Sequence, residues 1–165
     1  MTDKTIHEAV RDGIRILALR AHSRAELVSK LKKKGFDEET VEAAMSKFES
    51  MGLIDDPGFA AGYLESMSRR RPEGRFKARM RLLRKGVPEG LADEVLNNYD
   101  ATSLCEAAAE KKMRSLSGTP EIVRKKLETF LRNRGFDWSA IRQALSKLDL
   151  PDLRNDEDDG DGWRE

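Results

Sequence analysis

The chain has 165 residues, of which 37% are charged, 38% hydrophobic and 6% aromatic, and its formal net charge is +1. So little apolar material predicts thin cores and a large solvated surface, and the single cysteine, Cys105, excludes an internal disulfide and a cysteine zinc site. The start of the chain lacks a secretion signal and no window approaches about 18 apolar residues, so we expect a cytoplasmic protein without a membrane span.

The first predicted unit covers residues 1–53 and holds three helices. Apolar residues recur at helical spacing in the first of them. Ser23 and Glu26 then have the spacing of a capping box, in which the serine oxygen accepts a free amide and the glutamate reaches back to the serine amide. The second helix follows and ends at Gly35, because glycine adopts the left-handed conformation without strain. Asp37 is the expected cap of the third helix.

The second predicted unit covers residues 54–100. Asp55 and Asp56 stand before Pro57, and a capping aspartate followed by proline is typical of a helix start. Two adjacent carboxylates could also bind a metal ion, but capping explains them with fewer assumptions. A basic middle helix ends at Gly86. The apolar stripe of that middle helix is expected to consist of Phe76, Met80 and Leu83.

The third predicted unit covers residues 101–149, with Thr102 as the cap of its first helix, Thr119-Pro120 at the start of the second and Asp137 at the start of the third. Residues 150–165 are rich in aspartate and glycine, so we expect a disordered acidic tail. The fold is therefore predicted to be all-α, without strands. In chain order, the nine expected helices cover about residues 6–21, 24–34, 37–52, 55–69, 75–85, 88–99, 102–116, 119–135 and 137–148.

One pattern returns in all three units. Leu27, Leu31, Gly35, Phe36 and Asp37 recur 100 residues later as Leu127, Leu131, Gly135, Phe136 and Asp137. A weaker copy, with Ala78, Leu82 and Gly86, lies 51 residues after the first. A period near fifty predicts stacked supersecondary units, each of which completes its core on a neighbour. We therefore expect an elongated tandem array of three three-helix repeats that presents extended surfaces for binding.

The near-zero net charge conceals a basic middle and an acidic end. Between Ser66 and Gly86, nine basic residues stand against one acid, Glu73. These nine candidate binding residues are Arg69, Arg70, Arg71, Arg75, Lys77, Arg79, Arg81, Arg84 and Lys85. From Asp149 to Glu165, eight acids stand against two arginines. The acidic tail is interpreted either as a solubility device or as a decoy that folds back on the cations.

Helix position decides how such cations are interpreted, because exposed carbonyl groups favour positive charge at a helix C-terminus. That explanation and a binding role are equally good for Lys32, Lys33, Lys34, Arg84, Lys85, Arg132 and Arg134. The seven cations from Arg69 to Arg81 are instead expected before or early in their helix, where the dipole disfavours them. Their partner is therefore expected to be anionic, either nucleic-acid phosphate or an acidic protein surface. Few aromatic residues are available to stack on bases, so contact with the nucleic-acid backbone is expected.

No catalytic constellation is predicted. The only histidines, His7 and His22, lie at opposite ends of one expected helix and cannot share a metal ion. Cys105 lies in an alanine-rich helix and is interpreted as a buried apolar group rather than a redox centre. We therefore expect no enzyme, no cofactor and no metal site.

With its repeats and basic helix, the chain resembles the RecX family, bacterial regulators of the RecA recombinase. The resemblance covers about residues 10–148. It rests on Ser23-x-x-Glu26-Leu27 with Leu31, Gly52-Leu53-Ile54-Asp55-Asp56-x-x-Phe59-Ala60-x-x-Tyr63, Arg79-x-x-Leu82-x-x-Lys85-Gly86 and Phe130-Leu131-x-x-Arg134-Gly135-Phe136. The family's usual Gly-Tyr-Gly-Pro before the middle helix reads Pro72-Glu73-Gly74-Arg75 here, and Ala78 and Arg81 replace an aliphatic residue and a glutamate, which makes this helix more basic.

The resemblance implies a monomer of tandem three-helix repeats that lies in the groove of a RecA filament on single-stranded DNA. There it would modulate the recombinase and ATPase activities of RecA, usually by inhibition and without chemistry of its own. From the basic residues we add the expectation of phosphate contacts to single-stranded DNA without sequence preference. Pairs of short helices joined at glycine leave a second hypothesis, a stand-alone nucleic-acid-binding protein or transcription factor of helix-turn-helix type.

Overall fold

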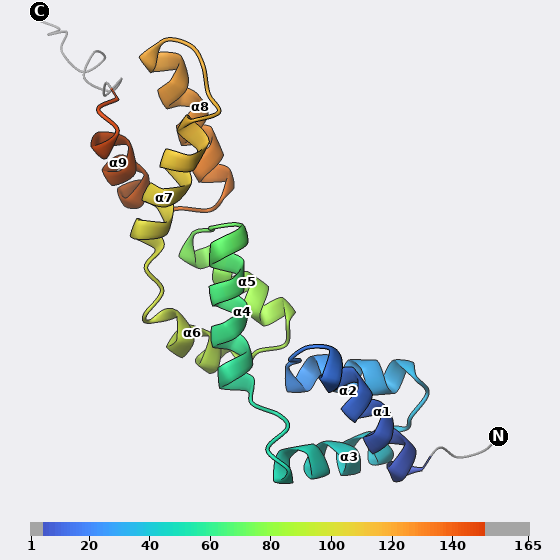
Figure 1. The fold of residues 1–165 in the computed structure, drawn as a ribbon. Coiled ribbons are helices and arrows are strands. Elements are labelled where there is room, and N and C mark those ends of the chain that lie inside the picture. Colours follow the sequence, from blue (N-terminus) through green and yellow to red (C-terminus); the bar gives the residue numbers. More distant parts are fainter. Residues whose placement is uncertain (1–4, 151–165) are drawn as a thin grey trace, which may run out of the picture. The chain divides into compact units, whose positions relative to one another are not determined.

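A computed structural model describes residues 5–150, which form nine α-helices and no strand (Figure 1). The helices are α1 (Ile6–Leu19), α2 (Arg24–Lys33), α3 (Glu38–Ser50), α4 (Asp56–Arg70), α5 (Arg75–Arg84), α6 (Glu89–Leu96), α7 (Ala101–Met113), α8 (Pro120–Asn133) and α9 (Trp138–Lys147). All nine predicted helices are confirmed, with ends that differ by a few residues. The predicted acidic tail lies outside the described residues, apart from Leu150. No helix among residues 5–150 is long and apolar enough to span a membrane.

The chain divides into two compact units. Unit 1 comprises Met1–Arg70 with Ala78–Tyr99, and unit 2 comprises Arg71–Lys77 with Asp100–Glu165. Helix α5 therefore begins in unit 2 and continues in unit 1.

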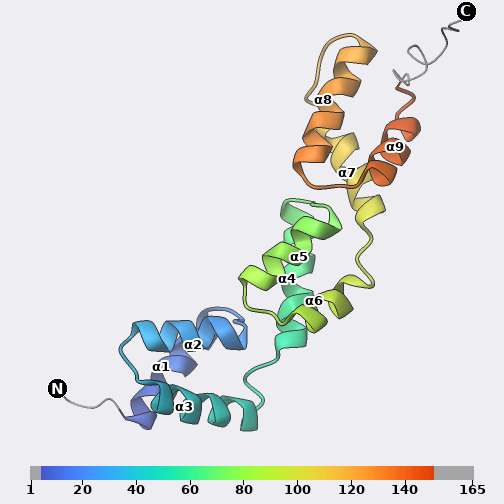
Figure 2. The same ribbon diagram turned by 180° about the vertical axis from the view of Figure 1, so that it is seen from behind.

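Unit 1 contains two groups of helices, α1–α3 and α4–α6 (Figure 2). Each group encloses its own apolar core. Helices α1, α2 and α3 enclose Ala9, Leu27, Leu31, Phe36, Val41, Ala44, Met45 and Phe48. Helices α4, α5 and α6 enclose Phe59, Ala60, Leu64, Met67, Ala78, Leu82, Val87, Ala92 and Leu96. Both cores follow the spacing of the repeat, because Leu27 and Leu31 of the first occupy the places of Ala78 and Leu82 in the second.

In unit 2, a single core lies between α7, α8 and α9. It consists of Cys105, Ala108, Ala109, Val123, Leu127, Leu131, Phe136, Ala140, Ile141, Ala144 and Leu145. Several of these residues are alanines, so α7 and α9 pack closely. The prediction that Cys105 is buried is confirmed.

Three helix caps differ from the sequence prediction. The side chain of Asp100, rather than Thr102, accepts the Ser103 amide at the start of α7, because the helix begins one residue earlier than expected. Ser23 accepts the Glu26 amide as expected, but the Glu26 carboxylate turns to Arg20 and Lys85 instead of the Ser23 amide. A complete capping box, which the sequence analysis missed, forms between Thr5 and Glu8 at the start of α1.

Asp55 and Asp56 divide the capping role between two helices. The Asp55 carboxylate accepts the Gly58 amide at 2.9 Å and so caps α4, as predicted. The Asp56 carboxylate instead accepts the Arg24 amide at 2.7 Å, at the free N-terminus of α2. Both carboxylates therefore satisfy backbone amides, and the second connects the two helix groups of unit 1.

The end of α5 joins the two helix groups of unit 1. The Ser23 hydroxyl donates a hydrogen bond to the Lys85 carbonyl, and the Lys85 ammonium lies 2.9 Å from the Glu26 carboxylate. Gly86 has φ +76°, and a Cβ added to it would lie 2.2 Å from the Cβ of Ala25. Gly86 thus ends α5 as predicted and also allows the turn to lie directly against α2.

Candidate functional site

Three of the nine predicted binding cations lie near a helix C-terminus and not near an N-terminus as predicted. Arg69 and Arg70 lie in the last turn of α4, because that helix runs on to Arg70. Arg81 lies in the last turn of α5 together with Arg84. The helix dipole favours positive charge at these places. The prediction that the dipole disfavours these three cations is therefore wrong. It stands for Arg75, Lys77 and Arg79 in the first half of α5, whereas Arg71 directly follows the end of α4.

Three of the six candidate cations in unit 1, Arg69, Arg79 and Lys85, form ion pairs within the fold. The Arg79 guanidinium donates to both oxygens of Asp93, at 2.6 and 3.0 Å, and hydrogen bonding to this carboxylate raises the pKa of Arg79. Arg69 pairs with Glu65 one helical turn earlier, at 2.6 Å. These arginines are thus occupied in the structure.

Lys85 belongs to a polar cluster of unit 1 that includes Glu26, Arg20 and Tyr63. Its ammonium lies 5.7 Å from the centre of the Tyr63 ring and shares the Glu26 carboxylate with Arg20. Burial alone would raise the pKa of Glu26, but hydrogen bonds from Arg20 and Lys85 outweigh it and lower this pKa to about 2. Lys85 therefore stabilises the contact between α2 and α5.

In unit 2, the residues before and at the start of α5 pack on the end of α8. Lys77 donates a hydrogen bond to the Asn133 carbonyl at 2.5 Å, and the Gly74 amide donates to the Arg134 carbonyl at 2.9 Å. The carbonyls at the end of α8 therefore explain the position of Lys77. Arg71 lies 3.4 Å from the buried Glu73 carboxylate.

Three of the nine candidates are exposed and have no partner among residues 5–150. They are Arg70 and Arg84 in unit 1 and Arg75 in unit 2. Arg81 is half-buried and has a partner.

The predicted apolar stripe of α5 is wrong in part. Ala78 and Leu82 form its buried face, whereas Phe76 is 71% exposed. The repeat pattern pointed to Ala78 and Leu82, since they occupy the places of Leu27 and Leu31.

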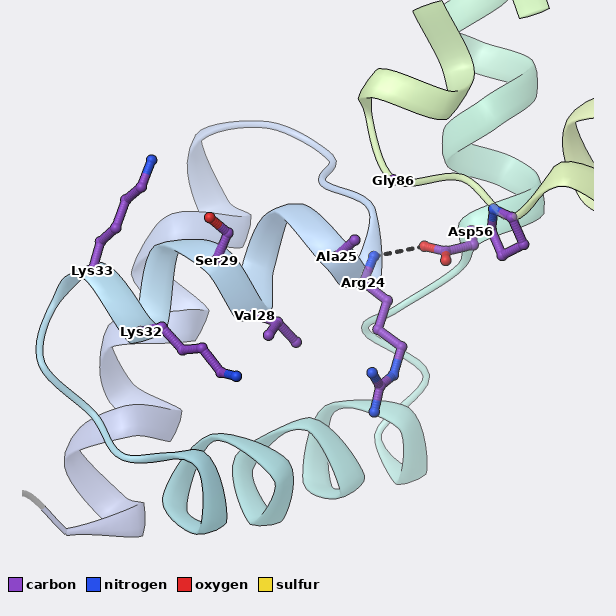
Figure 3. Close-up of a pocket in the computed structure, with 9 residues that line it drawn as sticks. Arg24, Ala25, Val28, Ser29, Lys32, Lys33, Asp56 and Gly86 are labelled. Carbon is purple, nitrogen blue, oxygen red and sulfur yellow. Dashed lines mark hydrogen bonds between the residues drawn. The ribbon is translucent and has the colours of Figure 1, made fainter. Parts of the chain in front are cut away.

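A hollow of about 770 Å³ opens in unit 1 between α2 and the turn that follows α5 (Figure 3). Ala25, Val28, Gly86 and Pro88 form its apolar part. Arg24, Ser29, Lys32, Lys33 and Asp56 complete the lining. Figure 3 shows Ser29 and Lys33 on one side of α2, and Val28 and Lys32 on the other.

A second hollow, of about 370 Å³, adjoins the first and shares Ala25, Ser29, Lys33 and Gly86 with it. Its other wall is the end of α5, with Leu83, Arg84 and Lys85. Lys30 and Glu26 complete the lining. Because they share these residues, the two hollows form one groove across the outer face of α2, which we call the α2 groove.

The cations of α2 differ in their partners. Lys32 pairs with Glu38 at 2.8 Å and Lys34 with Asp12 at 3.1 Å, and the latter contact lowers the pKa of Asp12. Lys30 and Lys33 are exposed, and within residues 5–150 neither has a partner. From the sequence, Lys33 was equally well explained by its place at a helix end or by binding, and Lys30 was not predicted to have a role. The three-residue spacing of these lysines on an outward helix face was the available signal.

Other chemistry is limited to the buried thiol. Burial raises the pKa of the Cys105 thiol to about 12, so the group is held in its unreactive neutral form. Within residues 5–150, no three His, Cys, Asp or Glu side chains are arranged to bind a metal ion. The groove and the unpaired cations therefore remain the candidate functional features.

Comparison with protein families matches each helix group in order. The family models for the first, second and third three-helix domains of RecX match residues 9–48, 55–96 and 99–145. The regulatory protein RecX of Chlorobaculum tepidum is 53% identical over 137 residues, which are 83% of this chain and 86% of that protein. The regulatory protein RecX of Pelodictyon phaeoclathratiforme is 45% identical over 158 residues, covering 95% and 99% of the two chains.

Two solved structures have the same fold. The crystal structure of RecX from Lactobacillus salivarius superposes with a TM-score of 0.75 at 22% identity, covering 88% of this chain and 97% of that one. A second crystal structure of regulatory protein RecX gives a TM-score of 0.71 at 24% identity, covering 86% and 71%. This chain matches the three RecX three-helix domains in tandem and is up to 53% identical to the relatives named above, so it belongs to the RecX family of regulatory proteins.

Proposed function

We propose that this protein binds the RecA filament on single-stranded DNA and inhibits the ATPase and recombinase activities of RecA. The observation that carries the proposal is the ordered match of all three helix groups to the RecX domains, together with 53% identity to a regulatory protein RecX. The protein acts by binding rather than by chemistry, because its distinctive features are unpaired surface cations and an open groove.

The exposed cations Arg70, Arg75 and Arg84 contact phosphate in this proposal. They have no partner among the described residues, so they bind an anion without first breaking an ion pair. Arginine presents a planar fork of donors to phosphate oxygens. The contact is independent of base sequence, because phosphate groups are the same along the strand.

The direct test measures ATP hydrolysis by RecA on single-stranded DNA with increasing amounts of the purified protein. We expect hydrolysis to fall at amounts up to equimolar with RecA. Unchanged hydrolysis and strand exchange at every ratio would contradict the proposal.

Substitution of Arg70, Arg75 and Arg84 by alanine tests the phosphate contacts. The triple variant should keep its helical circular dichroism and bind single-stranded DNA more weakly. The slope of log affinity against log salt should become shallower by about 0.7 for each lost contact. Arg79→Ala is the contrasting control, because Arg79 is occupied by Asp93 and its loss should lower the unfolding midpoint instead. An unchanged salt slope in the triple variant would show that these cations are merely solvated.

The alternative function, a stand-alone DNA-binding protein of helix-turn-helix type, predicts different behaviour on duplex DNA. Such a protein binds particular sequences far more tightly than random ones. Equal, weak and salt-sensitive affinity for all duplexes supports the filament proposal, and strong sequence preference supports the alternative.

A further inference from the structure

The α2 groove has two chemically different halves. Val28 and Pro88 line only the first hollow and form an apolar floor with Ala25, which lines both, whereas Lys30 and Arg84 line only the second hollow. Lys33 borders both halves. A ligand that fills the groove must therefore present an apolar group beside negative charge.

The charge in the groove is available for an external partner. Lys30, Lys33 and Arg84 have no ion pair within residues 5–150. The two carboxylates that line the groove are already occupied, since Glu26 holds Arg20 and Lys85, and Asp56 accepts the Arg24 amide. The unpaired charge of the groove is thus positive.

The apolar half distinguishes between the two kinds of anionic partner. A phosphate chain would use the cations and leave the floor of Ala25, Val28 and Pro88 empty. The lining contains no aromatic ring on which a base could stack. The first hollow, about 770 Å³, is large enough for a bulky side chain and lies beside the cations.

We infer that the α2 groove is a docking site for an acidic protein segment that carries a bulky apolar side chain. The apolar side chain lies on Ala25, Val28 and Pro88, and flanking carboxylates pair with Lys33 and Lys30, whereas Arg84 at the rim keeps the phosphate contact of the proposed function. The inference rests on the proposed function only for the source of this segment, which is the protein component of the filament.

Matched substitutions test each half of the groove in the full chain. Lys33→Glu reverses one groove charge, and Lys47→Glu is its control, because Lys47 is also exposed, unpaired within the described residues and in the last turn of a helix of unit 1. Ser29→Trp fills the first hollow from the exposed face of α2, and Ser46→Trp places the same side chain on the exposed face of α3.

The variants are compared for affinity to RecA filaments, to naked oligothymidylate and to a short labelled peptide of glutamate and leucine. We expect Lys33→Glu to weaken filament and peptide binding about fivefold and Ser29→Trp about tenfold. The affinities of Lys47→Glu and Ser46→Trp for filaments and for the peptide should stay within about twofold of those of the unmodified protein. An all-glutamate peptide of equal length should bind more weakly than the mixed one, because it leaves the apolar floor uncovered.

The outcomes separate this inference from the proposed function. If the unmodified protein inhibits RecA but the groove variants bind filaments normally, or lose oligothymidylate affinity as strongly as filament affinity, the docking site is overturned and the proposed function stands. If the unmodified protein does not bind RecA, the proposed function fails. In that case, loss of peptide binding in the groove variants still supports the docking site, and absence of peptide binding by the unmodified protein overturns it.

Discussion

Gly86 is the position at which a single methyl group should disrupt the contact between the two helix groups of unit 1. Its φ of +76° is a conformation that costs a residue with a side chain about 1–2 kcal/mol. In Gly86→Ala the new Cβ would also lie 2.2 Å from the Cβ of Ala25. The turn must therefore move away from α2, at an additional cost of about 1–3 kcal/mol for forced overpacking. We expect the free energy of unfolding to fall by about 2–5 kcal/mol.

Two other glycines separate the contributions to this loss. Gly52 has φ +65° with no atom within 4 Å of an added Cβ, so Gly52→Ala measures the conformational cost alone, about 1–2 kcal/mol. Gly90 lies in α6, where an added Cβ meets nothing within 4 Å. Gly90→Ala should stabilise the protein by about 0.5–1 kcal/mol.

The assay is urea unfolding followed by circular dichroism, with the double variant Ala25→Gly, Gly86→Ala. Removing the Ala25 methyl group should recover the part of the loss that comes from the clash, although glycine in a helix costs up to about 1 kcal/mol. The reasoning is refuted if Gly86→Ala is no more destabilising than Gly52→Ala, or if the double variant shows no recovery.

Two further predictions concern titratable groups. The pKa of Glu26 is lowered to about 2, so this carboxylate stabilises the fold above pH 4.5, and the contribution is lost as the pH falls towards 2. The upper limit of this contribution to the free energy of unfolding is about 3 kcal/mol. We expect about half of it, because the Arg20 side chain is 48% exposed and solvent screens the pair. Urea unfolding measured over a pH series should show this loss, and Glu26→Gln should make the dependence of stability on pH flatter. Cys105 is buried and its thiol pKa is raised to about 12, so it should react with a thiol reagent at pH 8 only as fast as the core opens. A reaction as fast as that of a free thiol would show that α7 is not packed as described.

The helices and stop glycines were predictable because their signals are local. Ser23, Asp37 and Asp137 each accept an amide three residues later, as their place before an apolar run indicates. The third helix of each three-helix repeat, α3, α6 or α9, was predictable in the same way from the aspartate or proline that precedes it. Periodicity identified the buried faces, although Phe76 shows that an aromatic residue near a helix start need not belong to one.

The candidate site was less predictable, because the state of a cation depends on residues far away in the sequence. Arg79 pairs with Asp93 and Lys85 with Glu26, 59 residues away. Charge counting treats these cations like the unpaired Arg75, since composition carries no information about partners. The α2 groove was missed for the same reason: one wall comes from α2 and the other from the end of α5.

In both units, the turn that ends the middle helix of one helix group lies against the region where the preceding middle helix begins. This contact explains Gly74, which no helix end or turn requires. In unit 1, Gly86 at the end of α5 lies against Ala25 near the start of α2. In unit 2, Gly135 at the end of α8 lies against Gly74, where an added Cβ would be 1.7 Å from the Gly135 carbonyl oxygen. Three of the four residues from Pro72 to Arg75 depart from the family pattern. The fourth, Gly74, keeps the glycine of that pattern, and backbone contact with Gly135 leaves it no space for a side chain. In both cases a contact between neighbouring helix groups requires a glycine, because an added Cβ would overlap the facing helix end or turn.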